Sequence, residues 1–174
     1  MALTTDALLQ SLSDHVLAHG LQTASLRPLA KAAGTSDRML IYHFGSKEAL
    51  VDDVLHYIAD RMAHDLTALL TDQRSRSAGA LLENLWQAAQ SETMRPTMRI
   101  WLELVAIASR EGGAKANVAD QIVTGFLDWT AAHLTDPEDA PFVLTQFEGL
   151  LVLQEAGHAA TAATGLKRLR EKLG

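Results

Sequence analysis

The sequence contains no cysteine, and this absence excludes two classes of site at once. Without thiols the chain has neither a disulfide framework nor a thiolate metal centre. It also lacks any apolar run near the roughly 20 residues that a membrane-spanning helix requires. Its first residues have neither the basic start nor the apolar core of a signal peptide. We therefore expect a cytoplasmic protein with no membrane partner.

Aromatic residues make up only 5% of the chain, whereas aliphatic residues and alanine supply most of its 48% hydrophobic content. This balance favours helices over strands, because strands are enriched in aromatic and β-branched residues. No internal repeat or low-complexity tract is present. A length of 174 residues corresponds to one or two small domains with a substantial core. The composition therefore predicts an all-α protein.

Net positive charge is also missing, because the chain carries a formal net charge of −6. Residues 1–50 contain four basic and four acidic side chains, which leaves 11 of the 15 basic and 17 of the 21 acidic side chains in residues 51–174. The acidic excess therefore lies in the C-terminal part. A neutral N-terminal part predicts modest non-specific affinity for phosphate.

Residues 25–33 have the pattern of a short amphipathic helix. The i, i+3, i+4, i+7 spacing of one apolar helix face is met by Leu26, Leu29, Ala30 and Ala33. Ser25 precedes them as an N-cap whose hydroxyl can accept a first-turn amide. Pro28 falls in the first turn, where an amide donor is not yet needed. Gly34 is expected to end the helix, because glycine enters the left-handed conformation at little cost.

A second short helix follows after a tight turn. Thr35 or Ser36 can cap its start, and Gly45 breaks it. Leu40 and Phe44 lie four residues apart and are expected to face the core. A helix, a short glycine-containing turn and a second helix form a helix-turn-helix, whose second helix enters the major groove of DNA.

A resemblance to a known family lies in this stretch. The residues that carry it are Gly34, Thr35, Ser36, Leu40, Tyr42, His43, Phe44, Gly45, Ser46, Lys47, Glu48, Ala49 and Leu50. Their types and spacing resemble the N-terminal domain of TetR-family transcriptional regulators, with a motif that covers about residues 21–51. The resemblance implies a helix-turn-helix DNA-binding domain in residues 1–50. It also implies a helical ligand-binding and dimerisation domain in residues 51–174.

The donors in the first domain suggest which residues contact double-stranded DNA. Phosphate contacts fix register without reading sequence, and we expect them from Ser25, Arg27, Thr35, Ser36, Tyr42, His43 and Lys47. Arg38 is predicted to read guanine through O6 and N7. Asp37 either accepts from a cytosine amine or only stabilises the helix N-terminus, and Met39 is placed to touch a thymine methyl. Ile41 departs from the family, which commonly has a tyrosine there; Tyr42 is available for part of that phosphate contact.

The rest of the chain predicts more helices, nine in total. Outside the helix-turn-helix, apolar periodicity marks residues 5–19, 46–71, 80–91, 95–110, 114–134 and 141–158. A small-residue stretch over residues 159–165 leads into the last helix. Ser46 caps the long fourth helix, which connects the two domains. The polar segment 71–79 is the predicted linker.

The resemblance further implies a small-molecule cavity in the helical body. Its predicted lining is Met62, His64, Trp86, Met98, Trp101, Glu103, Gln121, Phe126 and Trp129. Ordinary helix core is the alternative explanation for each of them.

Two histidine patterns have the four-residue spacing of a helical metal site. They are His15 with His19, and His56 with Asp60 and His64. A solvated helix face or a polar pocket lining explains both patterns more simply. No metal and no cofactor is therefore predicted.

The eighth helix is apolar on more sides than one core face requires, through Phe142, Phe147, Leu150, Leu151 and Val152. Small residues such as Gly149 would let a partner helix approach closely. In the family the last two helices form a four-helix dimer interface. The resemblance therefore implies a homodimer, whose two-fold symmetry matches a palindromic operator.

These features predict a ligand-responsive dimeric transcriptional regulator, most simply a repressor released from its operator by a small molecule. The alternative is an all-helical small-molecule carrier or enzyme whose head no longer reads DNA, favoured by the acidic charge and the lack of a basic N-terminal arm. Against an enzyme, the chain has no paired Glu-x-x-His motif, nucleophile elbow or phosphate loop. We therefore expect no enzymatic activity.

Overall fold

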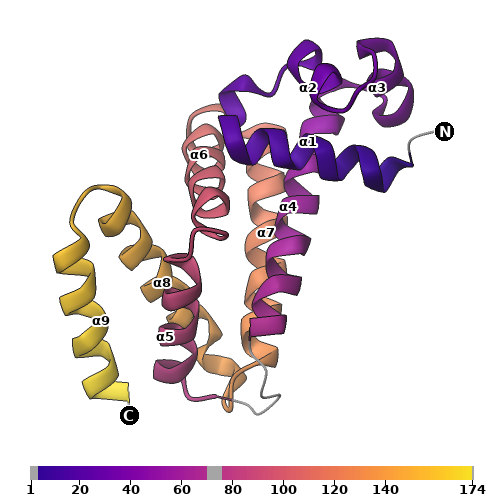
Figure 1. Cartoon of the computed structure of the whole chain (residues 1–174). Coiled ribbons are helices and arrows are strands. Elements are labelled where there is room, and N and C mark those ends of the chain that lie inside the picture. Colours follow the sequence, from indigo (N-terminus) through magenta and orange to yellow (C-terminus); the bar gives the residue numbers. More distant parts are fainter. Residues whose placement is uncertain (1–3, 70–75, 174) are drawn as a thin grey trace. The chain divides into compact units, whose positions relative to one another are not determined.

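A computed structural model describes residues 4–69 and 76–173, and the chain is helical through almost all of this range (Figure 1). The nine α-helices of the described residues, with two short 3₁₀ turns, confirm the all-α prediction. In chain order they are α1 (Thr5–His19), η1 (Leu21–Thr23), α2 (Leu26–Ala32), α3 (Asp37–Phe44), α4 (Lys47–Leu69), α5 (Ala78–Ala89), α6 (Arg95–Glu111), α7 (Gly113–Ala132), η2 (Pro137–Asp139), α8 (Ala140–Glu155) and α9 (Ala159–Leu173). None of the described helices is long and apolar enough to cross a bilayer.

The chain forms two compact units. The described part of the first unit is residues 4–62 and 95–122, and that of the second is residues 63–69, 76–94 and 123–173. Two of the three divisions fall within α4 and α7 and the third just before α6, so compactness does not separate the chain at residue 50. The functional division into residues 1–50 and 51–174 stays a prediction.

The first unit has one hydrophobic core, built by the head (α1, α2 and α3) together with parts of α4, α6 and α7. Its most deeply buried side chains are Leu8, Leu12, Val16, Leu29, Leu40, Leu50, Val54 and Leu104. Complete burial of one such side chain stabilises the fold by about 1.5–3 kcal/mol. Ile100 of α6 and Val118 of α7 belong to the same cluster. The head therefore shares its core with α6 and α7.

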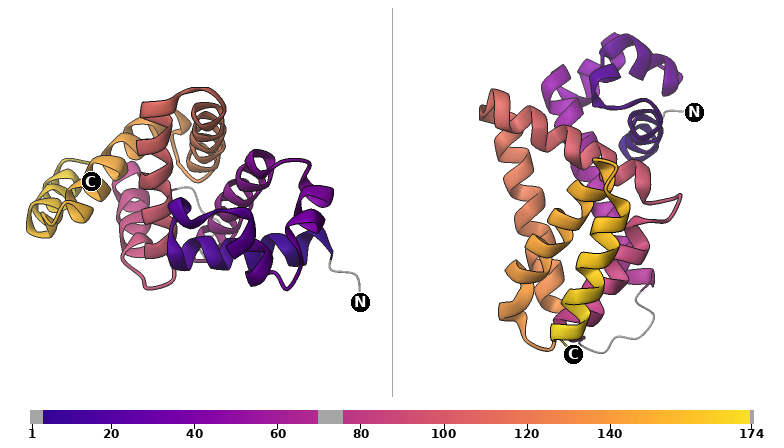
Figure 2. Two further views of the ribbon diagram at one scale, coloured as in Figure 1. Left: turned by 90° about the horizontal axis from the view of Figure 1, so that it is seen from above. Right: turned by 90° about the vertical axis from the view of Figure 1, so that its left-hand side faces the viewer.

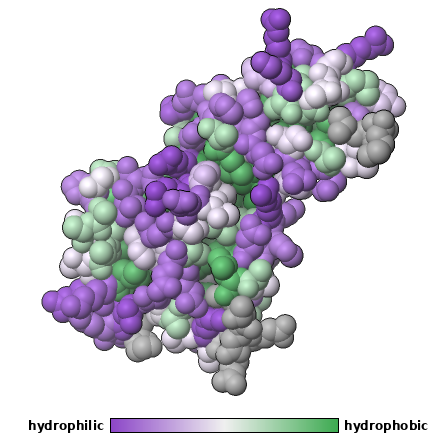
Figure 3. Space-filling model, viewed as in Figure 1, coloured by the Kyte–Doolittle hydropathy of each residue, from purple (hydrophilic) through white to green (hydrophobic). Residues whose placement is uncertain are grey.

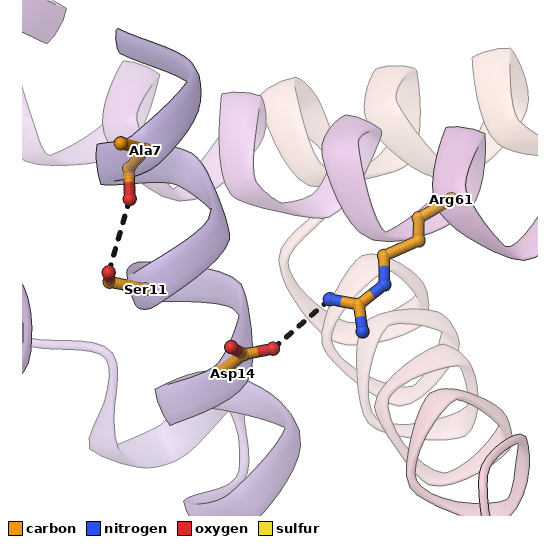
Figure 4. Close-up of polar contacts among 4 residues, drawn as sticks. All are labelled: Ala7, Ser11, Asp14 and Arg61. Atoms are coloured by element: carbon orange, nitrogen blue, oxygen red, sulfur yellow. Dashed lines mark hydrogen bonds and ion pairs between the residues drawn. The ribbon is translucent and has the colours of Figure 1, made fainter. Parts of the chain in front are cut away.

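Polar contacts also tie α4 to its neighbours in the first unit. Arg61 of α4 pairs with Asp14 of α1 at 3.1 Å between Nη1 and Oδ1 (Figure 4). Both side chains are about half exposed, so the pair contributes at most about 1 kcal/mol. Lys115 of α7 pairs with Asp52 of α4 in a less exposed position. These pairs add modestly to the apolar packing that holds the helices together.

The second unit is organised around α8, which packs against α5 and α9. Figure 2 shows α8 and α9 running side by side. The apolar core between these helices includes Leu81, Leu82, Leu85, Val143, Phe147, Leu151 and Ala162. The segment before α5 is tied to the end of α7 through Arg76, whose N–H donates to His133 O at 3.0 Å and whose carbonyl accepts from Thr135 N at 2.8 Å.

Most predicted helix boundaries differ by a few residues from those observed. The predicted linker over residues 71–79 lies partly outside the described residues, and its last two residues form the first turn of α5. The small-residue stretch 159–165 is itself helical and opens α9. Alanine has the highest helix propensity, which accounts for a helix through this stretch.

Candidate nucleic-acid interface

The helices α2 and α3 pack against each other and are joined by a turn of four residues. Gly34 in this turn has a φ of +63°, a left-handed conformation that favours glycine. Thr35 N donates to Ala30 O at 2.9 Å, which closes the turn against α2. Gly45 ends α3 with a φ of +82°. This is the predicted helix-turn-helix, with both glycines in their predicted roles.

Two of the three predicted serine N-caps in this stretch are formed, and one is not. Ser36 accepts from Met39 N at 3.3 Å and Ser46 accepts from Ala49 N at 3.0 Å, so each cap hydroxyl bonds to the amide three residues ahead. The prediction that the Ser25 hydroxyl caps α2 in the same way is wrong, because no side-chain cap hydrogen bond forms there. The residue three positions after Ser25 is Pro28, which has no N–H to donate.

The two faces of α3 differ as the sequence predicts. Leu40 is completely buried and Phe44 is 8% exposed, and both belong to the core of the first unit. Met39 is 42% exposed and Tyr42 is 79% exposed. Large apolar or aromatic side chains with this exposure are free to contact a partner. Two core side chains therefore hold α3 in place while its other face stays in solvent.

The predicted DNA contacts lie at this surface. Nine of the ten are exposed, namely Ser25, Arg27, Ser36, Asp37, Arg38, Met39, Tyr42, His43 and Lys47, while Thr35 is half-buried. They come from the start of α2, the turn, α3 and the start of α4. Long hydrophilic side chains protrude from this end of the head (Figure 3). Asp37 lies in the first turn of α3, so both of its interpretations stay open. The assignment of each residue to a base or phosphate stays a prediction.

The predicted ligand residues are distributed over both units. Met62, Met98, Trp101, Glu103 and Gln121 lie in the first unit, and His64, Trp86, Phe126 and Trp129 lie in the second. Met98 and Trp86 are buried, whereas His64 and Gln121 are exposed. The carboxylate of Glu103 accepts from Leu21 N at 2.8 Å. The role of these residues in ligand binding stays a prediction.

Within the second unit, two of these residues belong to a row of stacked rings on α7. Phe126 and Trp129 are parallel to within 5° with ring centroids 5.5 Å apart, and Trp129 stacks on His133 at 4.2 Å. The indole N–H of Trp129 donates to Thr67 Oγ1 at 2.8 Å. His133 is not among the site residues predicted from the sequence, although its spacing of four from Trp129 places the two rings on one helix face.

A separate pocket of about 310 Å³ lies in the second unit between α5 and α9. It is lined by Gly79, Ala80, Glu83, Asn84 and Arg170, none of which was predicted to bind a ligand. The guanidinium of Arg170 pairs with Glu83 across it, at 2.6 Å between Nε and Oε2. The pocket is therefore already bridged by an ion pair.

The histidines His15 and His19 stack on each other at the end of α1, with ring centroids 4.3 Å apart. Burial, and secondarily the neighbouring His19, lowers the pKa of His15 below its ordinary value of 6.5. His15 Nε2 is buried without a hydrogen-bond partner, which agrees with that direction. Among the described residues no group of three or more His, Asp or Glu side chains is placed to hold a metal ion.

Comparisons with known proteins agree with this geometry. Residues 16–54 match the family model described as bacterial regulatory proteins, tetR family. The matched range runs from the end of α1 through α3 into α4, so it contains the whole helix-turn-helix. No curated protein matches the chain in sequence.

Solved structures match over nearly the whole chain. A putative TetR-family transcriptional regulator from Rhodococcus sp. is 22% identical, with 97% of each chain covered and a TM-score of 0.72. The putative transcriptional regulator SCO7518 from Streptomyces coelicolor A3(2) is 20% identical over 97% of this chain and 96% of that chain, with a TM-score of 0.74. The multidrug binding protein EbrR complexed with proflavin is 20% identical over 97% and 98%, with a TM-score of 0.71. These likenesses establish a common fold.

A core-anchored helix-turn-helix with an exposed second helix has the arrangement that DNA-binding domains use to place a helix in the major groove. The family match falls on that motif, and the fold is shared beyond it. Residues 16–54 thus match the tetR family of bacterial regulatory proteins, and the chain as a whole shares its fold with solved chains described as TetR-family regulators.

Proposed function

We propose that this chain is a cytoplasmic, dimeric, ligand-responsive repressor that binds a palindromic operator and is released by a small molecule. The proposal depends on one observation, namely that α3 has one buried face and one exposed face. Leu40 and Phe44 hold the helix in the core, while Arg38, Met39 and Tyr42 remain exposed. A helix held in this way can enter the major groove without exposing its own core. Arg38 is the residue best suited to read a base.

The dimer is supported by the surface of α8. Phe142 is 37% exposed and Val152 is 52% exposed, although Val143, Leu150 and Leu151 of the same helix are buried. Apolar side chains on a second face of one helix are typical of an interface. Pairing of two copies through α8 and α9 gives a two-fold axis, which an operator of two inverted half-sites matches.

The response to a ligand is supported by the shared fold, since one chain with this fold binds multiple drugs and has been solved with proflavin. In our chain the proposed lining is the set of nine residues named above, dominated by aromatic and methionine side chains. Such a lining suits an apolar or planar aromatic effector. The effector releases DNA only to the extent that it binds the DNA-free conformation more tightly than the DNA-bound one.

The test begins with selection of a preferred duplex from random-sequence DNA by the wild-type protein, followed by binding measurements at increasing salt. We expect a palindromic preference and a steep loss of affinity with salt, since phosphate contacts release counterions. The variant Arg38→Ala should lose about 1–3 kcal/mol of binding free energy and relax the preference at one base position in each half-site.

The matched control is Arg110→Ala, which removes the same charge from the exposed end of α6. It should leave the base preference unchanged. An unchanged preference in Arg38→Ala contradicts the assignment of Arg38. Wild-type binding with no preferred duplex and little dependence on salt contradicts the repressor and favours the carrier.

A further inference from the structure

The connection between α1 and α2 has a capping arrangement that involves a distant helix. Gly20 ends α1 by donating its N–H to Val16 O at 2.8 Å, and η1 begins at the next residue, Leu21. Gly20 occupies the N-cap position of η1 and has no side chain with which to cap it. The carboxylate of Glu103, 82 residues further along the chain on α6, accepts from Leu21 N at 2.8 Å. Glu103 therefore satisfies one of the free N–H groups at the start of η1, as capping side chains do at helix N-termini.

The glycine and the glutamate fit each other. A Cβ placed on Gly20 would lie 3.1 Å from Glu103 Oε1 and 3.3 Å from Oε2, so the carboxylate occupies the space that a side chain would fill. Gly20 also has a φ of +87°, a backbone conformation that residues with a side chain rarely adopt. The absence of a side chain at residue 20 thus serves both the turn and the approach of Glu103.

The helix that carries Glu103 is fixed against the head. Ile100 and Leu104, on either side of Glu103 in the sequence, are 3% and 1% exposed and belong to the same core cluster as Leu21. α6 packs against both α1 and η1. The backbone of Glu103 is held in α6 by these buried neighbours. A displacement of α6 therefore moves Glu103, and with it the turn that Glu103 caps.

We propose that Glu103 is a positioning residue for the reading of DNA: its carboxylate caps η1, fixes the path from α1 into α2, and so links the placement of α2 and α3 to that of α6. A displacement of α6 would then pull on Leu21 and change how α3 is presented. This inference rests on the proposed DNA-binding function for its effect on affinity, but the cap itself is measurable without DNA.

The experiment separates the reach of the side chain from its charge. Glu103→Asp keeps the charge but is one methylene shorter, whereas Glu103→Gln loses the charge but keeps an oxygen at the same reach. The exposed Glu111→Asp and Glu111→Gln, at the end of the same helix, are the controls. Each full-length variant is compared with the wild type by the hydrogen exchange rate of the Leu21 amide, measured by NMR, and by affinity for the selected duplex.

We expect Glu103→Asp to exchange the Leu21 amide about fivefold to tenfold faster and to bind the duplex about fivefold more weakly, the size expected for loss of one hydrogen bond. Glu103→Gln should stay within about twofold of the wild type in both measurements, because an amide oxygen still accepts. Both Glu111 variants should match the wild type.

Equal exchange and affinity in Glu103→Asp and the wild type would overturn the proposal. Impairment of Glu103→Gln with an unaffected Glu103→Asp would also overturn it, because charge and not the cap would then matter. If the wild type itself selects no duplex, the proposed function fails, and the Leu21 exchange rates still decide whether Glu103 holds the turn.

Discussion

At the scale of single residues, Pro28 shows how one side chain changes the role of another. Ser36 and Ser46 each cap a helix through the amide three residues ahead, and Ser25 has the same position before α2. Three residues after Ser25 stands Pro28, which has no N–H, so the Ser25 hydroxyl has no amide donor at that position. Ser25 is exposed at the start of α2, so its hydroxyl is available to a phosphate.

This difference predicts unequal effects of two serine substitutions on stability. Ser36→Ala removes a formed cap and should lower the free energy of unfolding by about 1 kcal/mol. Ser25→Ala removes no cap hydrogen bond and should change it by less than about 0.5 kcal/mol. Chemical denaturation followed by circular dichroism checks both values. An equal loss in the two variants would mean that Pro28 does not decide the cap.

His15 gives a pH dependence of stability. Its pKa in the folded protein is lowered, so the unfolded chain binds the proton more tightly. The stability from the neutral ring is therefore present above the ordinary value of 6.5 and is lost as pH falls through the lower folded-state pKa. His15→Gln should reduce the loss of melting temperature between about pH 7.5 and pH 5.5. The same pH slope in both proteins would contradict the burial of this ring.

At the scale of elements, the sequence was sufficient where the cause of a structure is local. Gly34, Gly45 and the cap at Ser46 are found as predicted, and the cap before α3 is Ser36, one of the two residues predicted for it. The inward side of α3 followed from the spacing of four between Leu40 and Phe44. Helix ends were less accurate, because alanine-rich and polar segments carry no strong stop signal.

The sequence was insufficient where contacts join distant segments. The packing of Ile100 and Leu104 into the core of the head, and the bond from Leu21 to Glu103, join residues about 80 positions apart. Amphipathic spacing shows that α6 has a buried face but does not identify what covers it. Glu103 was accordingly predicted only as a ligand anchor, and its hydrogen bond to η1 required the structure.

At the scale of the whole molecule, the proposed dimer predicts a specific loss of assembly. Val152→Glu places a charge on the exposed face of α8 without disturbing the buried side of that helix. An unpaired charge in an interface is costly, so we expect sedimentation to show a shift from dimer to monomer and operator affinity to fall. The control is Val105→Glu on α6, an exposed valine at 39%, which should remain dimeric. A dimeric Val152→Glu protein would place the interface elsewhere.

The most direct test of the central claim places a cleavage reagent on α3. The chain has no native cysteine, so Met39→Cys offers a single attachment point for an iron chelate. Bound to the selected duplex, this protein should cut the DNA in two clusters, symmetric about its centre and about 10 base pairs or a multiple apart. The same chelate on Val105→Cys should give no clusters. Cleavage by the Met39→Cys protein no stronger than that of this control would contradict entry of α3 into the major groove.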